Sequence, residues 1–170
     1  MLSVIRSMAE LPFGSLMEIY AESNRVRGSR WPQEAPERQI ALAEQEFYAY
    51  LRQCFFTRPG SRYFVWEEQG KPVCALRCES YADGMLLTAL ETAPDCRGKG
   101  YATQLLRAVL SHLEAVKVYV HIHKDNQASL AVHLSCGFVK YRTGARMLDG
   151  SYSGDYDTYV TELNGNLRNA

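Results

Sequence analysis

Apolar and polar residues repeat with two different periods along the chain, and these periods divide it into strands and helices. Short apolar or alternating runs, bounded by glycine, proline or aspartate, predict strands. The predicted strands cover residues 2–7, 63–67, 72–78, 85–92, 116–123, 138–147 and 156–163.

Apolar residues spaced three and four apart predict helices between these strands. The most regular helix spans residues 100–114, and one of its faces is apolar. That face consists of Ala102, Leu105, Leu106, Val109, Leu110 and Leu113. A shorter helix is expected at 126–135, where Asn126 is a candidate N-cap and Gly137 a stop signal. Two further helices are expected at 13–26 and 37–55.

The order of these elements predicts a mixed α/β fold. Three strands joined by short turns, from residue 63 to residue 92, predict an antiparallel meander. The strand, helix, strand order that follows, from 85 to 123, is typical of a parallel crossover. We therefore expect one twisted mixed sheet of about seven strands with helices on both faces, in a single domain that spans residues 1–170.

Charge and cysteine content exclude several classes of function. The 19 basic residues equal the 19 acidic residues, so no global field attracts the chain to nucleic acid or to a membrane surface. No window reaches the roughly 18 apolar residues of a membrane span, and residues 1–10 lack a signal-peptide pattern. The five cysteines lack C-x-x-C spacing, so we expect reduced thiols, no metal and a cytoplasmic location.

The segment that carries candidate chemistry is residues 92–103, which joins a predicted strand to the most regular helix. It holds Gly98 and Gly100 beside Arg97 and Lys99. Glycines let the backbone approach a ligand closely, and free N–H groups at a helix N-terminus bind phosphate. The glycine spacing matches neither the P-loop nor the dinucleotide-binding pattern. The segment therefore predicts an anion site of a different kind, with a solvated turn as the alternative.

This segment resembles the GNAT superfamily of acyl-CoA N-acyltransferases. The family signature Arg/Gln-x-x-Gly-x-Gly/Ala is met by Arg97, Gly100 and Ala102. Downstream, Asn126 and the pair Gly137-Phe138 are similar to the second family signature. The resemblance is clear from about residue 63 to residue 138 and loose in the first 60 residues. It implies a GNAT-like fold and transfer of an acetyl group from acetyl-CoA to a primary amine in a ternary complex.

The resemblance also implies which residues bind acetyl-CoA, the only cofactor expected. The backbone of three strand residues would pair with the pantetheine arm, seven loop and helix residues would hold the pyrophosphate, and two residues of the second signature would contribute contacts. In that order the residues are Leu90, Glu91, Thr92; Arg97, Gly98, Lys99, Gly100, Tyr101, Ala102, Thr103; Asn126 and Ser129. For Asn126, an ordinary helix-capping role is an equally simple interpretation.

Three residues are candidates for proton transfer. Many members of the family carry a tyrosine acid four residues before the glycine of the second signature, where this chain has His133. His133 is either that acid or a packed structural histidine. His121 is the first candidate for the base and Glu91 the alternative. His121 and His123 are two residues apart on a strand and therefore project from the same face. Two histidines without a third ligand do not predict a metal site.

The acceptor amine is not determined by any motif. The resemblance implies that the first two helices shape its pocket, with an ordinary helix-packing surface as the alternative. The candidate residues there are Tyr20, Arg25, Arg27, Arg30, Trp31 and Tyr48. Arginines would suit an acceptor that bears a carboxylate. A non-catalytic acyl-CoA-binding module is the alternative function, because the usual tyrosine is missing. A homodimer is a further possibility implied by the resemblance.

Overall fold

The structure is a computed structural model that describes residues 1–114 and 117–163. Within these ranges seven strands form one sheet in the order β1-β2-β3-β4-β5-β7-β6. The strands are β1 Leu2–Ile5, β2 Arg62–Glu68, β3 Lys71–Tyr81, β4 Gly84–Thr92, β5 Lys117–His123, β6 Val139–Arg146 and β7 Tyr152–Glu162. Among the described strands, only β4 and β5 pair in parallel. The predicted meander and crossover are therefore confirmed.

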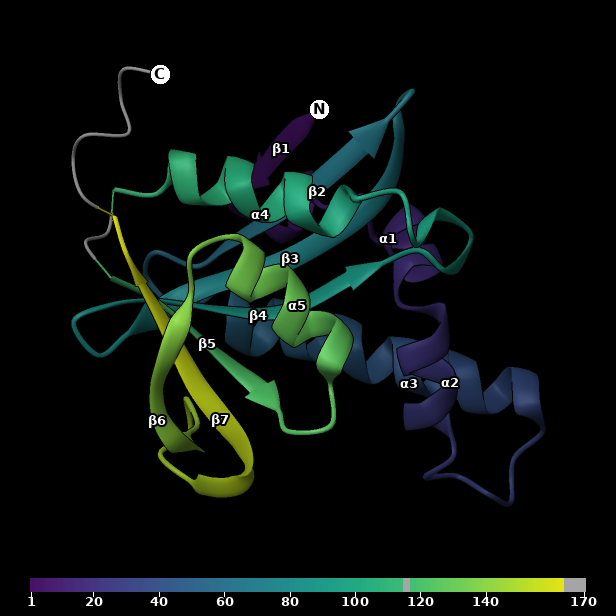
Figure 1. Ribbon diagram of the computed structural model, residues 1–170. Coiled ribbons are helices and arrows are strands. Elements are labelled where there is room, and N and C mark those ends of the chain that lie inside the picture. The colour runs from purple at the N-terminus through teal and green to yellow at the C-terminus, as the bar shows by residue number, and fades with distance from the viewer. Residues whose placement is uncertain (115–116, 164–170) are drawn as a thin grey trace.

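Helices cover both faces of the sheet, as the sequence predicts (Figure 1). They are α1 Phe13–Ile19, α2 Ala21–Gly28, α3 Pro36–Tyr50, α4 Tyr101–His112 and α5 Gln127–Ser135. Figure 1 shows α4 and α5 in front of the sheet and α3 behind it. Two hydrophobic cores lie on the two faces of the sheet. The core on the α4 side includes Leu76, Leu105 and Val120, and the core on the α3 side includes Phe47 and Tyr63.

The sequence prediction of one helix over 13–26 is wrong, because the helix breaks at Tyr20. Tyr20 ends α1 and begins α2, with φ −92° and ψ 15°. Its side chain is 3% exposed, and its hydroxyl donates to the Ala89 carbonyl oxygen at 2.9 Å. Burial of this one aromatic ring against the sheet turns the chain, which helical periodicity alone does not reveal.

Other boundaries shift by a few residues. The predicted helix 37–55 is α3 followed by a π-helical turn at Leu51–Phe55. β1 ends at Ile5, and a 3₁₀ turn follows at Met8–Glu10. β7 begins at Tyr152 rather than at residue 156, because Ala145 and Arg146 of β6 still pair with Ser153 and Tyr152. Val116, the predicted start of a strand, lies outside the described residues.

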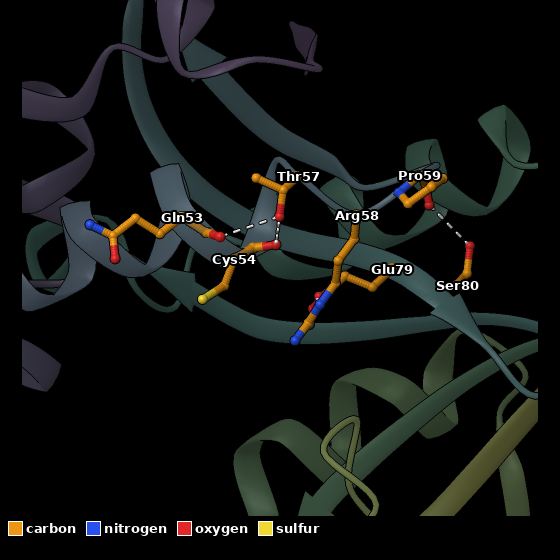
Figure 2. Close-up of polar contacts among 7 residues, drawn as sticks. All are labelled: Gln53, Cys54, Thr57, Arg58, Pro59, Glu79 and Ser80. Carbon is orange, nitrogen blue, oxygen red and sulfur yellow. Dashed lines mark hydrogen bonds and ion pairs between the residues drawn. The ribbon is translucent and has the colours of Figure 1, made fainter.

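An ion pair fixes the chain between α3 and β2 to the sheet (Figure 2). The Glu79 side chain on β3 is 2% exposed and accepts from the guanidinium of Arg58 at 2.5 Å. Ser80 beside it donates to the Pro59 carbonyl oxygen at 3.4 Å. A buried carboxylate needs such a partner. Among the described residues, no helix is both long enough and apolar enough to cross a membrane.

Candidate active site

The site lies where β4 and β5 separate. Their parallel pairing comprises Met85 with Val118, Leu86 with Tyr119, and Leu87 with Val120. Beyond Leu87 no pairing of β4 with β5 occurs among the described residues. Strand β4 continues to Thr92, and β5 continues to His123 against β7. Backbone groups on the facing edges of β4 and β5 are therefore left to bind a ligand.

A β-bulge in β4 accompanies this separation. Ala75 pairs with Glu91 but Arg77 pairs with Thr88, so β4 has one more residue than β3 between these two pairs. Ala89 in the bulge has φ +51°, a left-handed conformation that costs a non-glycine residue about 1–2 kcal/mol. Its carbonyl oxygen accepts from Tyr20, which in turn accepts from the Tyr63 hydroxyl at 2.7 Å. Two buried tyrosines thus hold the strained strand in place.

A cavity of about 830 Å³ fills the gap between the strands. All three candidate proton-transfer residues, Glu91, His121 and His133, line it. It is also lined by all but one of the predicted cofactor residues. These are Leu90, Glu91, Thr92, Arg97, Gly98, Gly100, Tyr101, Ala102, Thr103, Asn126 and Ser129. The exception is Lys99, whose ammonium donates instead to the Asp95 carbonyl oxygen at 3.0 Å.

The glycine loop closes one end of the cavity. Gly98 and Gly100 have φ +75° and φ +80°, conformations that favour glycine. Gly100 is the N-cap of α4 and forms no side-chain cap, so the first N–H groups of this helix are available to an anion. Arg97 beside the loop forms an ion pair with Glu22 of α2 at 2.7 Å. The loop therefore has the geometry of a phosphate site.

Asn126 acts as a helix cap in this structure. Its side-chain oxygen accepts from the Ser129 backbone N–H at 3.0 Å at the start of α5. The capping interpretation of Asn126 is therefore confirmed, although the residue also lines the cavity.

Glu91 combines partial burial with several positive neighbours. Its carboxylate accepts from the Ser23 hydroxyl of α2 at 2.6 Å. Burial raises the pKa of the Glu91 carboxyl, while the bond from Ser23 and the charges of Arg97, Arg27 and Arg77 oppose the shift. A carboxylate whose pKa is raised binds a proton more strongly, which suits a general base.

His121 is already bonded at both ring nitrogens. Nε2 lies 3.1 Å from the Arg146 carbonyl oxygen, and Nδ1 lies 3.1 Å from the Thr158 hydroxyl. The Arg146 carbonyl can only accept, so Nε2 donates to it. The Thr158 hydroxyl gives its single hydrogen to the Gly144 carbonyl oxygen at 2.8 Å, so towards Nδ1 it can only accept. Burial also lowers the pKa of the His121 ring. Both ring nitrogens therefore contact protein oxygens rather than a ligand.

His133 has one fixed nitrogen and one free nitrogen. Nδ1 lies 2.8 Å from the Ser129 carbonyl oxygen and must donate to it. In the neutral ring the lone pair is then at Nε2, which is buried without a hydrogen-bond partner among the described residues. Burial lowers the pKa of this ring, which is 1% exposed and packs edge-on against Phe138. Nε2 is the atom that can exchange a proton.

The cavity also has lining residues that the sequence did not single out as site residues. They include Ser23, Cys96, His123 and Tyr156. Ser23 lies in a region that matches no motif, and only its contact with Glu91 identifies it. His123 packs edge-on against Tyr156 at 5.2 Å between ring centres. In the described ranges, no group of three or more His, Cys, Asp or Glu side chains is placed to hold a metal ion.

These features fit coenzyme A. The unpaired strand edges match an amide-containing pantetheine arm, and the N-terminus of α4 matches a pyrophosphate. A cavity of about 830 Å³ is within the range of cofactor sites, roughly 300–1,000 Å³. The donor set of the cavity therefore agrees with the cofactor that the family resemblance implies.

Comparisons with known proteins agree with this geometry. The sequence model of the Acetyltransferase (GNAT) family matches residues 15–138. No curated protein matches the chain closely enough to count as a relative.

Solved structures show the same fold at low identity. PaiA N-acetyltransferase from Thermoplasma acidophilum in complex with coenzyme A has a TM-score of 0.64 and 13% identity, over 96% of this chain and 99% of that one. Ribosomal-protein-S18-alanine N-acetyltransferase from Escherichia coli has a TM-score of 0.57 and 18% identity, over 98% and 99%. Spermidine N-acetyltransferase from Vibrio cholerae with CoA and spermine has a TM-score of 0.59 and 17% identity, over 95% of each chain. With the splayed strands and the glycine loop, the match over residues 15–138 shows that this chain belongs to the GNAT family of acetyltransferases and is an acyl-CoA N-acyltransferase.

Proposed function

We propose that this enzyme transfers the acetyl group of acetyl-CoA directly to a primary amine that is bound in the cleft at the same time. The observation that carries the proposal is the cavity itself. It places the glycine loop and the partly buried carboxylate of Glu91 on the lining of one space. A non-catalytic acyl-CoA module would need no such base, and family membership does not favour it.

Acetyl-CoA supplies a thioester, whose carbonyl carbon is open to attack by a neutral amine. In this proposal the amides of α4 from Tyr101 to Thr103, with Gly98 and Gly100, hold the pyrophosphate. The edge of β4 from Leu90 to Thr92 binds the pantetheine arm. These contacts fix the thioester between β4 and β5. The reacting atoms can then meet without a further loss of translational and rotational entropy.

Glu91 is the proposed base. The acceptor amine is protonated in water and must lose a proton before it can attack. Glu91 lines the cavity, its pKa is raised by burial, and the Ser23 hydroxyl holds one oxygen. His121 is a poorer base because both of its ring nitrogens already contact protein groups. The base assignment therefore moves from His121 to Glu91.

His133 is the proposed acid. As the bond to nitrogen forms and the bond to sulfur breaks, the thiolate must gain the proton that the amine loses. The Ser129 carbonyl fixes the hydrogen at Nδ1, so the proton delivered to sulfur comes from Nε2 of the protonated ring. A lowered pKa favours the neutral ring before the reaction, so Nε2 takes up the second proton that the attacking nitrogen loses and passes it to the departing thiolate.

Three broader assignments stay predictions. The 170 residues act as a single domain, in which one sheet carries all seven described strands. A cytoplasmic location is supported by the five free cysteines. A homodimer, and the absence of nucleic-acid and membrane partners, rest on the sequence alone.

The proposal is tested by thiol release from acetyl-CoA in the presence of amino acids, peptides, aminoglycosides and polyamines. Acetyl-CoA alone should raise the melting temperature, and at least one amine should release thiol in proportion to acetylated product. Stabilisation without thiol release from any acceptor class would support the binding-module alternative. Absence of stabilisation would contradict the cofactor assignment.

A further inference from the structure

Two neighbouring polar groups beside the cavity have no partner. Arg77 on β3 pairs across the sheet with Thr88 on β4. Arg77 Nε and Thr88 Oγ1 are both buried, and neither has a hydrogen-bond partner in the described ranges. Buried polar atoms without partners are rare in folded proteins, and both of these atoms can donate a hydrogen. Two adjacent donors indicate an acceptor group that binds between them.

Arg77 is also a charge without a counterion. Within residues 1–114 and 117–163 it forms no ion pair. The nearest acid along its strand face, Glu79, is already bound to Arg58, as Figure 2 shows. Aromatic rings of the α3 layer hold the guanidinium instead. Its Cζ lies 5.7 Å from the ring centre of Phe47, 5.0 Å from Tyr50 and 5.9 Å from Phe55. Aromatic rings therefore position the guanidinium, which forms no ion pair among the described residues although its charge acts on Glu91.

The two donors lie on the α3 side of the sheet. Residues opposite each other in an antiparallel pair point to the same sheet face. Arg77 thus shares a face with Thr88, and Ala75, two residues earlier on that face, is paired with Glu91. This is the α3 side of the sheet, whereas α4, which carries the phosphate loop at its N-terminus, covers the other side. Thr88 lines the cavity, and Arg77 is its partner on the neighbouring strand.

A second arginine lies in the same place. Arg27 of α2 has its Cζ 5.9 Å from the ring centre of Phe47, the ring that Arg77 also contacts. One helical turn separates Arg27 from Ser23, which donates to Glu91. Both arginines lower the pKa of Glu91 by their charge. The surroundings of the proposed base are therefore positive, which attracts an anion and repels a polycation.

We propose that Arg77 and Thr88 bind a carboxylate of the acceptor, so that the acceptor is a small amine that also bears an acid group, as an amino acid does. This inference rests on the proposed function, since it presumes an acceptor whose amine is next to Glu91. A guanidinium binds a carboxylate through two parallel hydrogen bonds, which also fixes the orientation of the ligand. A polyamine would leave both donors unpaired and would place further positive charge beside two arginines.

The test compares acids with their uncharged analogues. Thiol release is measured with each of the twenty amino acids, the matching amides and methyl esters, dipeptides, and spermidine. The acid should exceed its amide in kcat/KM by about 10- to 100-fold, the range expected for a hydrogen-bonded charge. Dipeptides distinguish a free amino acid from a peptide end as the source of the acid group.

Variants separate binding from structural support. Arg77→Lys keeps the charge but loses the two-point contact, Arg77→Met removes the charge, and Thr88→Val removes the hydroxyl. Each should lower the ratio of acid to amide kcat/KM, and Arg77→Met should bring it near one. Arg52→Gln, which removes an exposed arginine from the same side of the protein, should leave the ratio unchanged.

Several outcomes would overturn the inference. Amides or spermidine that react faster than acids would do so, as would an Arg77→Met variant that slows acid and amide equally. Both leave the acetyltransferase proposal intact, because thiol is still released. If no acceptor releases thiol, the same amino acids are titrated into the protein with CoA. Binding that Arg77→Met abolishes supports the carboxylate site, and no binding refutes it.

Discussion

The two walls of the cleft are built from different parts of the polypeptide. The cofactor wall consists of residues 90–92, 97–98 and 100–103 and offers mainly backbone groups at a strand edge and a helix N-terminus. The proposed acceptor wall consists of Ser23, Thr88, Glu91 and His121, with Arg77 paired to Thr88 on the neighbouring strand, and offers side chains from α2, β4 and β5. Glu91 belongs to both walls, through its backbone and its carboxylate respectively.

This difference determines which substitutions impair each wall. Backbone groups are present in every residue, so the cofactor wall depends on conformation, and its critical positions are glycines with positive φ. The acceptor wall depends on particular atoms, because a carboxylate or guanidinium has no backbone substitute. Changes to the cofactor wall should therefore weaken binding of acetyl-CoA, whereas changes to the acceptor-wall side chains should slow the chemical step.

The largest expected effect is on turnover in Glu91→Gln. Loss of a general base typically costs 10²–10⁴-fold, and we expect kcat to fall by roughly 1,000-fold. Glutamine has the same shape and can still contact Ser23, so the Kd for acetyl-CoA should change little. Steady-state kinetics and calorimetric titration measure the two quantities.

The pH profile provides the control for this variant. Glu91 must be ionised to accept a proton, so wild-type kcat/KM should rise with pH through a pKa above the usual glutamate value. This acidic limb should disappear in Glu91→Gln. An acidic limb that persists in Glu91→Gln but disappears in His121→Asn would return the base role to His121.

The second effect is a loss of turnover, by roughly 100-fold, in His133→Phe. Phenylalanine can pack edge-on against Phe138 as the imidazole does, so the melting temperature should be preserved. The variant removes only the proton at Nε2 and the bond to Ser129. A normal kcat in a stable variant would show that His133 is a packing residue alone.

The third effect is on cofactor affinity in Gly100→Ala. A left-handed φ costs alanine about 1–2 kcal/mol, which should lower the population of the binding conformation and raise the Kd for acetyl-CoA about tenfold. A Cβ at this position would approach Gln104 only to 3.8 Å, so strain rather than a clash is the cause.

Gly70→Ala is the matched control for that change. Gly70 has φ +77° in the turn between β2 and β3, and nothing lies within 4 Å of an added Cβ. It carries the same backbone strain away from the cleft. Equal losses of affinity in Gly70→Ala and Gly100→Ala would show a general loss of stability rather than a local effect on the phosphate loop.

The same contrast explains what the sequence could predict. The cofactor wall is continuous in sequence, so Arg97, Gly98 and Gly100 appear as a motif, and helical periodicity identifies α4 directly after it. The antiparallel meander was predicted from the short turns, and the parallel crossover from the strand, helix, strand order. The break at Tyr20 was missed because it depends on a contact with Ala89, 69 residues away in sequence.

The acceptor wall was only partly visible for the same reason. Glu91 and His121 could be suggested as bases from their positions on the strands. The choice between them depends on the contacts of the His121 ring nitrogens, which only the structure shows. The sequence drew attention to Arg25, Arg27 and Arg30, whereas Arg30 pairs with Glu46 on the surface. Arg77 could not be singled out, because its lack of a partner follows from the Arg58 to Glu79 ion pair.

The most direct test of the central claim measures acetyl-CoA affinity and kcat together in Glu91→Gln and Gly100→Ala. If one wall binds acetyl-CoA and the other carries out the chemical step, Glu91→Gln keeps its affinity for acetyl-CoA and loses turnover. Gly100→Ala then loses affinity for acetyl-CoA and keeps its kcat at saturating acetyl-CoA. Loss of both quantities in both variants, or normal turnover in Glu91→Gln, would contradict the account.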